Sequence, residues 1–81
     1  MHSAVEISMY PLAGEYRRLI EAFIDRLNTH SDMIVRTNAL STQIWGQLDR
    51  IMAMLAAEFE RAAAGPQLVF VMKVLPGLPP P

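Results

Sequence analysis

The feature that most constrains this chain is the change in hydrophobic spacing along its sequence. Over residues 5–10 apolar and polar side chains alternate, which is the period of a β-strand with one covered face. Over residues 16–27 the apolar positions recur every three or four residues, which is typical of an amphipathic helix. Pro11 has no amide proton and is expected to end the strand, and Gly14 is expected to cap the helix. The chain is therefore predicted to begin with a strand and a helix.

Two further strands are predicted in the middle of the chain. Residues 33–35 and 41–45 are enriched in β-branched and aromatic side chains. Neither glycine nor proline lies between them, so a hairpin bend is placed around Asn38-Ala39 on the turn preference of Asn alone. After Gly46 the helical spacing returns, which predicts a second amphipathic helix.

Gly65-Pro66 is expected to stop the second helix, and a last strand over residues 68–75 follows. This strand is apolar on both faces apart from Lys73, so it should be covered on both sides. Residues 76–81 are rich in proline and predict an extended or disordered tail.

The resulting order, strand-helix-strand-strand-helix-strand, predicts an α+β fold: a ferredoxin-like βαββαβ sandwich with one antiparallel sheet and two helices on one face. A chain of 81 residues has room for a single domain, assigned to residues 1–75. The first and third strands are central in this topology. The face without helices then carries Glu6, Ser8 and Tyr10.

Composition indicates a partner for part of the surface. Hydrophobic residues make up 52% of the chain and charged residues 19%, which is apolar for a domain with so much relative surface. The excess is assigned to Val69, Val71 and Leu75, with Trp45 as a neighbour, and self-association is expected there. Without cysteine, neither a disulfide nor a thiolate metal site can supply the missing stability.

Charge and hydropathy exclude several classes of partner. The formal net charge of −1 provides no basic field for nucleic acid. No cationic stretch precedes an apolar run at the N-terminus, and no window is long and apolar enough to cross a membrane. A soluble, cytoplasmic protein is expected.

Two segments resemble the YkoF-like thiamine- or hydroxymethylpyrimidine-binding proteins. Residues 6–12, EISMYPL, resemble the family's short strand ending in Ser-Leu-Tyr-Pro, and residues 36–46, RTNALSTQIWG, resemble its second motif. The resemblance spans residues 5–75, with residues 23–27 and 69–74 matching the family's first helix and last strand. It implies a ferredoxin-like domain that forms dimers or tetramers and binds an aminopyrimidine without turning it over. The best-described member has two such domains per chain, so a neighbouring subunit would complete the site here.

An aminopyrimidine has ring nitrogens that accept and an exocyclic amine that donates, so its site needs both kinds of group in a mostly apolar slot. Amide, hydroxyl, aromatic and carboxylate side chains in the two motifs could supply them. The predicted ligand-binding residues are Glu6, Ser8, Tyr10, Thr37, Asn38, Ser41 and Thr42.

Each of these positions also has a purely structural explanation. Asn38 and Ser41 are residues that commonly bond their own backbone in a turn. Ser8 and Thr42 could be solvent-facing strand positions, and Tyr10 could cover the sheet edge. Trp45 is a second stacking candidate, or a residue of the core or of a subunit interface.

The sequence gives little support for catalysis or a cofactor. His2 lies near the terminus and His30 in a polar loop, with no nearby group at the spacing of a nucleophile and its base. No metal site is expected. The alternative functions are an oligomeric structural or regulatory module with no pyrimidine ligand and, less favoured, an enzyme of the ferredoxin-like monooxygenase or isomerase kind, with Glu6 as the base.

Overall fold

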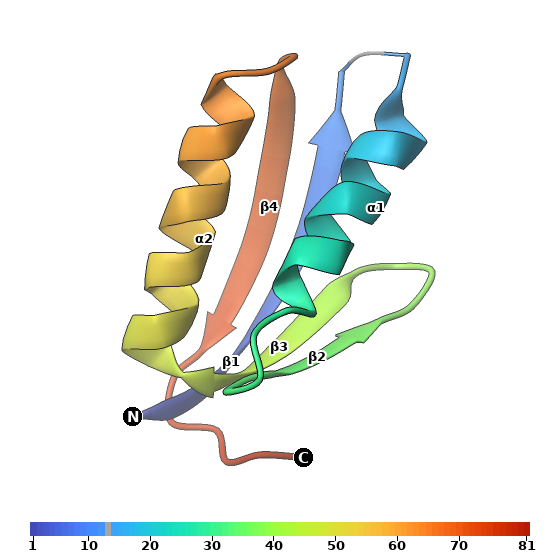
Figure 1. Cartoon of the computed structure of the whole chain (residues 1–81). Helices are drawn as coiled ribbons and strands as arrows, with labels where there is room; N and C mark the ends of the chain where they lie inside the picture. The colour runs from blue at the N-terminus through green and yellow to red at the C-terminus, as the bar shows by residue number, and fades with distance from the viewer. Residues whose placement is uncertain (13) are drawn as a thin grey trace.

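The computed structural model describes residues 1–12 and 14–81, and it has the predicted order of elements (Figure 1). The strands form one antiparallel sheet in the order β2-β3-β1-β4, so the first and third strands are central as predicted. Both helices cover the same face of the sheet (Figure 1). The ferredoxin-like fold is therefore confirmed. Its elements are β1 (His2–Pro11), α1 (Tyr16–Leu27), β2 (Ile34–Thr37), β3 (Thr42–Gln47), α2 (Leu48–Ala63) and β4 (Leu68–Leu75).

The core lies between the sheet and the two helices. Alternate residues of the central strands point toward the helices, and the helices contribute the apolar stripes predicted from their spacing. An ion pair joins the two helices: Arg26 Nε of α1 lies 2.8 Å from Glu58 Oε1 of α2. The buried cluster consists of Val5, Ile7, Phe23, Leu27, Ile44, Ile51, Met54 and Leu55.

Strand β1 is longer than its pairing with β3. Its ladder with β3 ends at Ile7↔Thr42, whereas its ladder with β4 continues to Pro11↔Leu68. One edge of β1 is therefore unpaired beyond Ile7, within the part of the chain that the structure describes.

Two backbone hydrogen bonds fix which way each residue of β1 turns its peptide groups. The Met1 carbonyl accepts from the Leu48 N–H at 2.9 Å, toward β3, and the Leu12 N–H donates to the Gln67 carbonyl at 3.0 Å, toward β4. Because these directions alternate along a strand, the nitrogen of Pro11 faces away from β4. Pro11 is the last residue of β1, as predicted, but the predicted reason is wrong: no ladder proton is missing, and Pro11 pairs with Leu68.

Strand β4 is an edge strand, and the chain itself covers one of its two faces, so cover of the other face by a second subunit stays a prediction. Its helix side includes Phe70 and Met72, which pack against the core, but the side chains on the other face are open. Val69, Val71 and Leu75 are 46%, 53% and 59% exposed. Exposed apolar surface is thus concentrated where the composition argument placed it.

The start of α1 and the start of the proline-rich tail both differ from what the sequence predicts. Helix α1 is capped by Glu15, with no side-chain hydrogen bond, rather than by Gly14. The start of the proline-rich tail turns back onto β1: Gly77, with a φ of 79°, donates its N–H to Ser3 Oγ at 3.2 Å. Glycine suits this left-handed backbone because it has no Cβ.

Replacing Ile44, which is fully buried on a central strand, tests the assignment of the core. Ile44→Ala should lower the free energy of unfolding by about 2–5 kcal/mol, because it removes buried apolar surface and leaves a cavity. Ile34 of β2 lies on the open face of the sheet, so Ile34→Ala should change the free energy of unfolding by less than about 1 kcal/mol. Urea denaturation followed by circular dichroism measures both, and equal losses would contradict the assignment.

Candidate functional site

A cavity of about 260 Å³ lies where the end of β1, helix α1 and the β2–β3 turn meet. Its lining residues come from three segments that are far apart in the sequence. Six of the seven predicted ligand-binding residues are among them: Ser8, Tyr10, Thr37, Asn38, Ser41 and Thr42. The structure thus brings the two motifs of the sequence together at one place.

The cavity exists because β1 extends past Ile7, the last of its residues that pairs with β3. Beyond Ile7 the β2–β3 hairpin diverges from β1, and α1 passes over the space between them (Figure 1). Ile20, Phe23 and Ile24 of α1 supply an apolar wall. The helical spacing of residues 16–27 could not reveal this wall, since a helix stripe that lines a cavity has the same spacing as one that fills a core.

The β2–β3 turn is built around Asn38, which confirms the predicted position of the bend. Asn38 Oδ1 accepts from the Leu40 N–H at 2.8 Å and from the Ser41 N–H at 3.1 Å, while the Asn38 N–H donates to the Ser41 carbonyl at 3.0 Å. The turn explanation of Asn38 therefore holds for its carbonyl oxygen. Its Nδ2 group makes no hydrogen bond to a described residue and remains able to donate.

Thr37 and Thr42 point toward the helices, as does Ile7, with which Thr42 pairs, so Thr42 is not a solvent-facing strand position. Their hydroxyls lie 3.0 Å apart across the hairpin, and Thr42 is buried. Ser8 faces the other way but joins the same turn, because its Oγ donates to the Leu40 carbonyl at 3.3 Å. These contacts hold the turn against β1.

Glu6 lies on the open face as predicted and does not line the cavity. Its Oε2 accepts from Ser41 Oγ at 2.9 Å, and its Oε1 lies 3.8 Å from Lys73 Nζ. Ser41 Oγ also accepts from Gln43 Nε2 at 2.8 Å. Glu6 is thus engaged in a surface network that reaches the site only through Ser41.

Trp45 belongs to a second hollow, of about 450 Å³, on the open face. Ala4, Leu75 and Leu78 line it together with Trp45, and the Arg36 guanidinium lies 5.5 Å from the centre of the indole ring. Trp45 therefore lies on a surface separate from Asn38 and does not stack on a ring held there.

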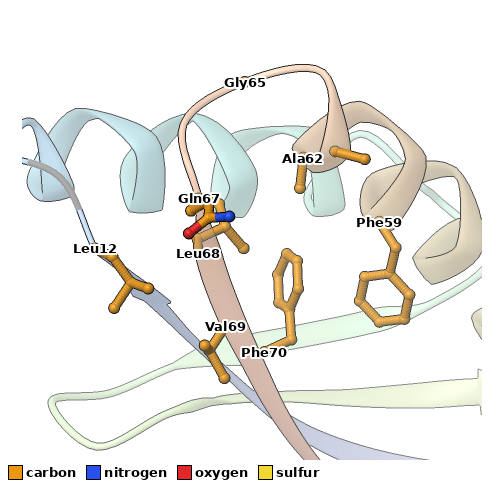
Figure 2. Close-up of a pocket in the computed structure, with 9 residues that line it drawn as sticks. Leu12, Phe59, Ala62, Gly65, Gln67, Leu68, Val69 and Phe70 are labelled. Atoms are coloured by element: carbon orange, nitrogen blue, oxygen red, sulfur yellow. The ribbon is translucent and has the colours of Figure 1, made fainter.

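A third cavity, of about 520 Å³, lies under the loop between α2 and β4 (Figure 2). Phe59 and Phe70 face into it with their ring centres 4.7 Å apart, and Leu12 lies across from them (Figure 2). Among its lining side chains only Gln67 is polar. Such a cavity offers little to orient a polar ligand, so the smaller cavity near Asn38 is the better candidate site.

The described residues contain no group of three or more His, Asp or Glu side chains arranged to hold a metal ion. Among the helices that the structure describes, none has the length and hydropathy needed to span a membrane.

The comparisons with known proteins are structural. No family model and no curated protein matches the sequence. A Streptococcus pneumoniae protein superposes with a TM-score of 0.85 at 20% identity, over 96% of this chain and 89% of its own. A Thermotoga maritima protein, provisionally named for thiamine biosynthesis or salvage, gives 0.81 at 15%, over 93% and 83%.

A hypothetical protein from Methanocaldococcus jannaschii gives a TM-score of 0.77 at 22% identity, over 90% of this chain and 77% of its own. At identities this low, the likeness establishes that these proteins share the fold of this chain. The YkoF-like resemblance is thus supported at the level of the fold.

Proposed function

We propose that this chain is a non-catalytic binding protein for thiamine or for its hydroxymethylpyrimidine part. The observation that carries the proposal is the meeting of six predicted residues, from two separate motifs, in the cavity between α1, β1 and the β2–β3 turn. The likeness to a protein provisionally named for thiamine biosynthesis or salvage supports it.

The chemistry of the cavity suits one small heteroaromatic ring. Its volume of about 260 Å³ is slightly below the usual range for sites that hold drug-sized ligands, and Phe23 and Ile24 supply apolar walls. Asn38 Nδ2 can donate to a ring nitrogen, and Tyr10, which is 53% exposed, can close over a ring face.

Binding without turnover is favoured by what lines the cavity. None of the described lining residues is a carboxylate, an imidazole or an amine, and Tyr10 is the only titratable side chain among them. General acid–base catalysis normally uses a group that titrates near the working pH. The carboxylate of Glu6, which accepts a hydrogen bond from Ser41, lies on the open face and is held there by Ser41 and Lys73.

The proposal predicts a specific loss of affinity in Asn38→Asp. The aspartate keeps an oxygen to accept from the Leu40 and Ser41 N–H groups but loses the Nδ2 donor. Its affinity for hydroxymethylpyrimidine should therefore fall by roughly tenfold, as expected for one lost hydrogen bond. Isothermal titration calorimetry measures the change.

Gln67→Glu is the matched control, because it makes the same change from amide to carboxylate just before β4, outside the lining of this cavity. It should bind hydroxymethylpyrimidine as the unmodified chain does. No heat from thiamine or hydroxymethylpyrimidine up to millimolar concentration, with a folded protein, would refute the proposed function.

We also propose that the chain self-associates, as a dimer or tetramer, through the exposed side of β4. Unpaired edge strands are usually short, charged or bulged, whereas β4 has eight residues with Lys73 as its one charge. Val69, Val71 and Leu75 leave an apolar row beside that edge. The alternative of a structural module, with Ser8 and Thr37 paired across a subunit seam, is less favoured because Thr37 already pairs with Thr42 and Ser8 with the Leu40 carbonyl.

Gel filtration tests the self-association. The chain should elute well ahead of its 9.1 kDa monomer position, and Val71→Glu should return it there because the new charge would be buried unpaired. Ile34→Glu, on the other edge of the sheet, should leave the elution volume unchanged. Elution of the unmodified chain as a monomer would refute the self-association.

A further inference from the structure

We propose that the backbone of Met9 reads the amine edge of the pyrimidine, with its N–H donating to a ring nitrogen and its C=O accepting from the exocyclic amine. This inference rests on the proposed function and assigns the recognition to peptide groups rather than to side chains. It begins from the unpaired edge of β1.

The alternation of peptide directions along β1 decides which residue faces the cavity. The Met1 carbonyl bonds toward β3 and the Leu12 N–H toward β4, and the pairing between them is regular, without a bulge. The odd-numbered residues therefore turn their N–H and C=O groups toward β3. Beyond Ile7, where β3 is no longer opposite, these residues are Met9 and Pro11.

Met9 is the one residue on this stretch of edge that presents both a donor and an acceptor. Pro11 has no N–H, and the even-numbered Ser8 and Tyr10 direct theirs into the ladder with β4. Met9 lines the cavity, and its side chain packs against the core, which holds the peptide in place. A buried or half-buried peptide edge of this kind needs a partner, which water or a ligand can supply.

Most of the polar side chains around the cavity already have hydrogen-bond partners, so they do not take the role proposed for the Met9 backbone. The hydroxyls of Thr37 and Thr42 bond one another, and Asn38 Oδ1 already accepts two backbone protons. Ser41 Oγ serves Glu6, and Ser8 Oγ donates to the Leu40 carbonyl. Side chains alone therefore supply few free acceptors for an exocyclic amine, whereas the Met9 carbonyl is one.

The geometry of the edge predicts the chemical class of ligand. One residue of an extended strand offers its donor and acceptor side by side, which matches a ring nitrogen next to an exocyclic amine. An oxo group in place of the amine reverses that pattern, so in the orientation that keeps a ring nitrogen on Asn38 Nδ2 the ring would meet donor with donor and acceptor with acceptor. The site should therefore select aminopyrimidines over oxopyrimidines, and the mismatch should cost roughly ten- to hundredfold in affinity.

Nuclear magnetic resonance of the isotopically labelled chain, titrated with hydroxymethylpyrimidine, tests the inference directly. The Met9 amide proton should shift downfield and exchange more slowly with solvent at saturation. The Tyr10 amide, which faces β4, is the internal control and should keep its exchange rate. A Met9 amide that neither shifts nor slows, while the Asn38 side-chain amide responds, would overturn this inference and leave the proposed function intact.

If no resonance around the cavity responds, the proposed function itself fails. The oxo analogue of hydroxymethylpyrimidine supplies a second readout that needs no variant of the protein. Its affinity should be at least about tenfold weaker, and equal affinity would overturn the role of the Met9 edge.

Two substitutions separate the backbone of Met9 from its side chain. Met9→Leu keeps the N–H and an apolar side chain and should bind hydroxymethylpyrimidine within about threefold of the unmodified chain. Met9→Pro removes the N–H at an edge that no described strand uses, and its affinity should fall by roughly tenfold or more. A folded Met9→Pro chain with unchanged affinity would overturn the inference.

Discussion

The structure depends on the unequal pairing of β1. The strand holds the sheet together, since it lies between β3 and β4, but its ladder with β4 continues to Pro11, four residues beyond Ile7, where its ladder with β3 ends. The longer ladder anchors the edge strand, and the shorter one leaves a space beside the last residues of β1. Helix α1 and the Asn38 turn close that space into the candidate site. One mismatch of ladder length thus accounts for both the stability of β4 and the position of the cavity.

The two faces of the sheet perform different tasks. On the helix side, Val5 and Ile7 belong to the core, and Thr37 and Thr42 join the hairpin to the cavity. On the open side, Glu6, Ser41 and Lys73 form a polar network between the hollow beside Trp45 and the apolar row of β4. Ser41 belongs to both regions, because it lines the cavity and its hydroxyl donates to Glu6.

The sequence predicted the fold well because hydrophobic period and stop signals were both strong. Helix α1 and strand β4 have the predicted bounds, and the ferredoxin-like order followed from them. Pro11 ends β1 as predicted, but its missing N–H is not the cause, because the effect of a proline depends on which way its nitrogen faces, and that depends on a distant ladder. The face on which Thr37 and Thr42 lie could not be predicted, because the parity of β3 is set by a turn without glycine or proline. Neither the cavity wall from α1 nor the proposed role of Met9 could be predicted from the local sequence, since both arise only when three segments meet.

A crystal structure of the chain grown with hydroxymethylpyrimidine tests the central claim most directly. We predict ring density between α1 and the β2–β3 turn, with the exocyclic amine on the Met9 carbonyl and Asn38 Nδ2 on the other side of the ring. Density beside Trp45 on the open face, or an empty cavity at saturating ligand, would contradict the account.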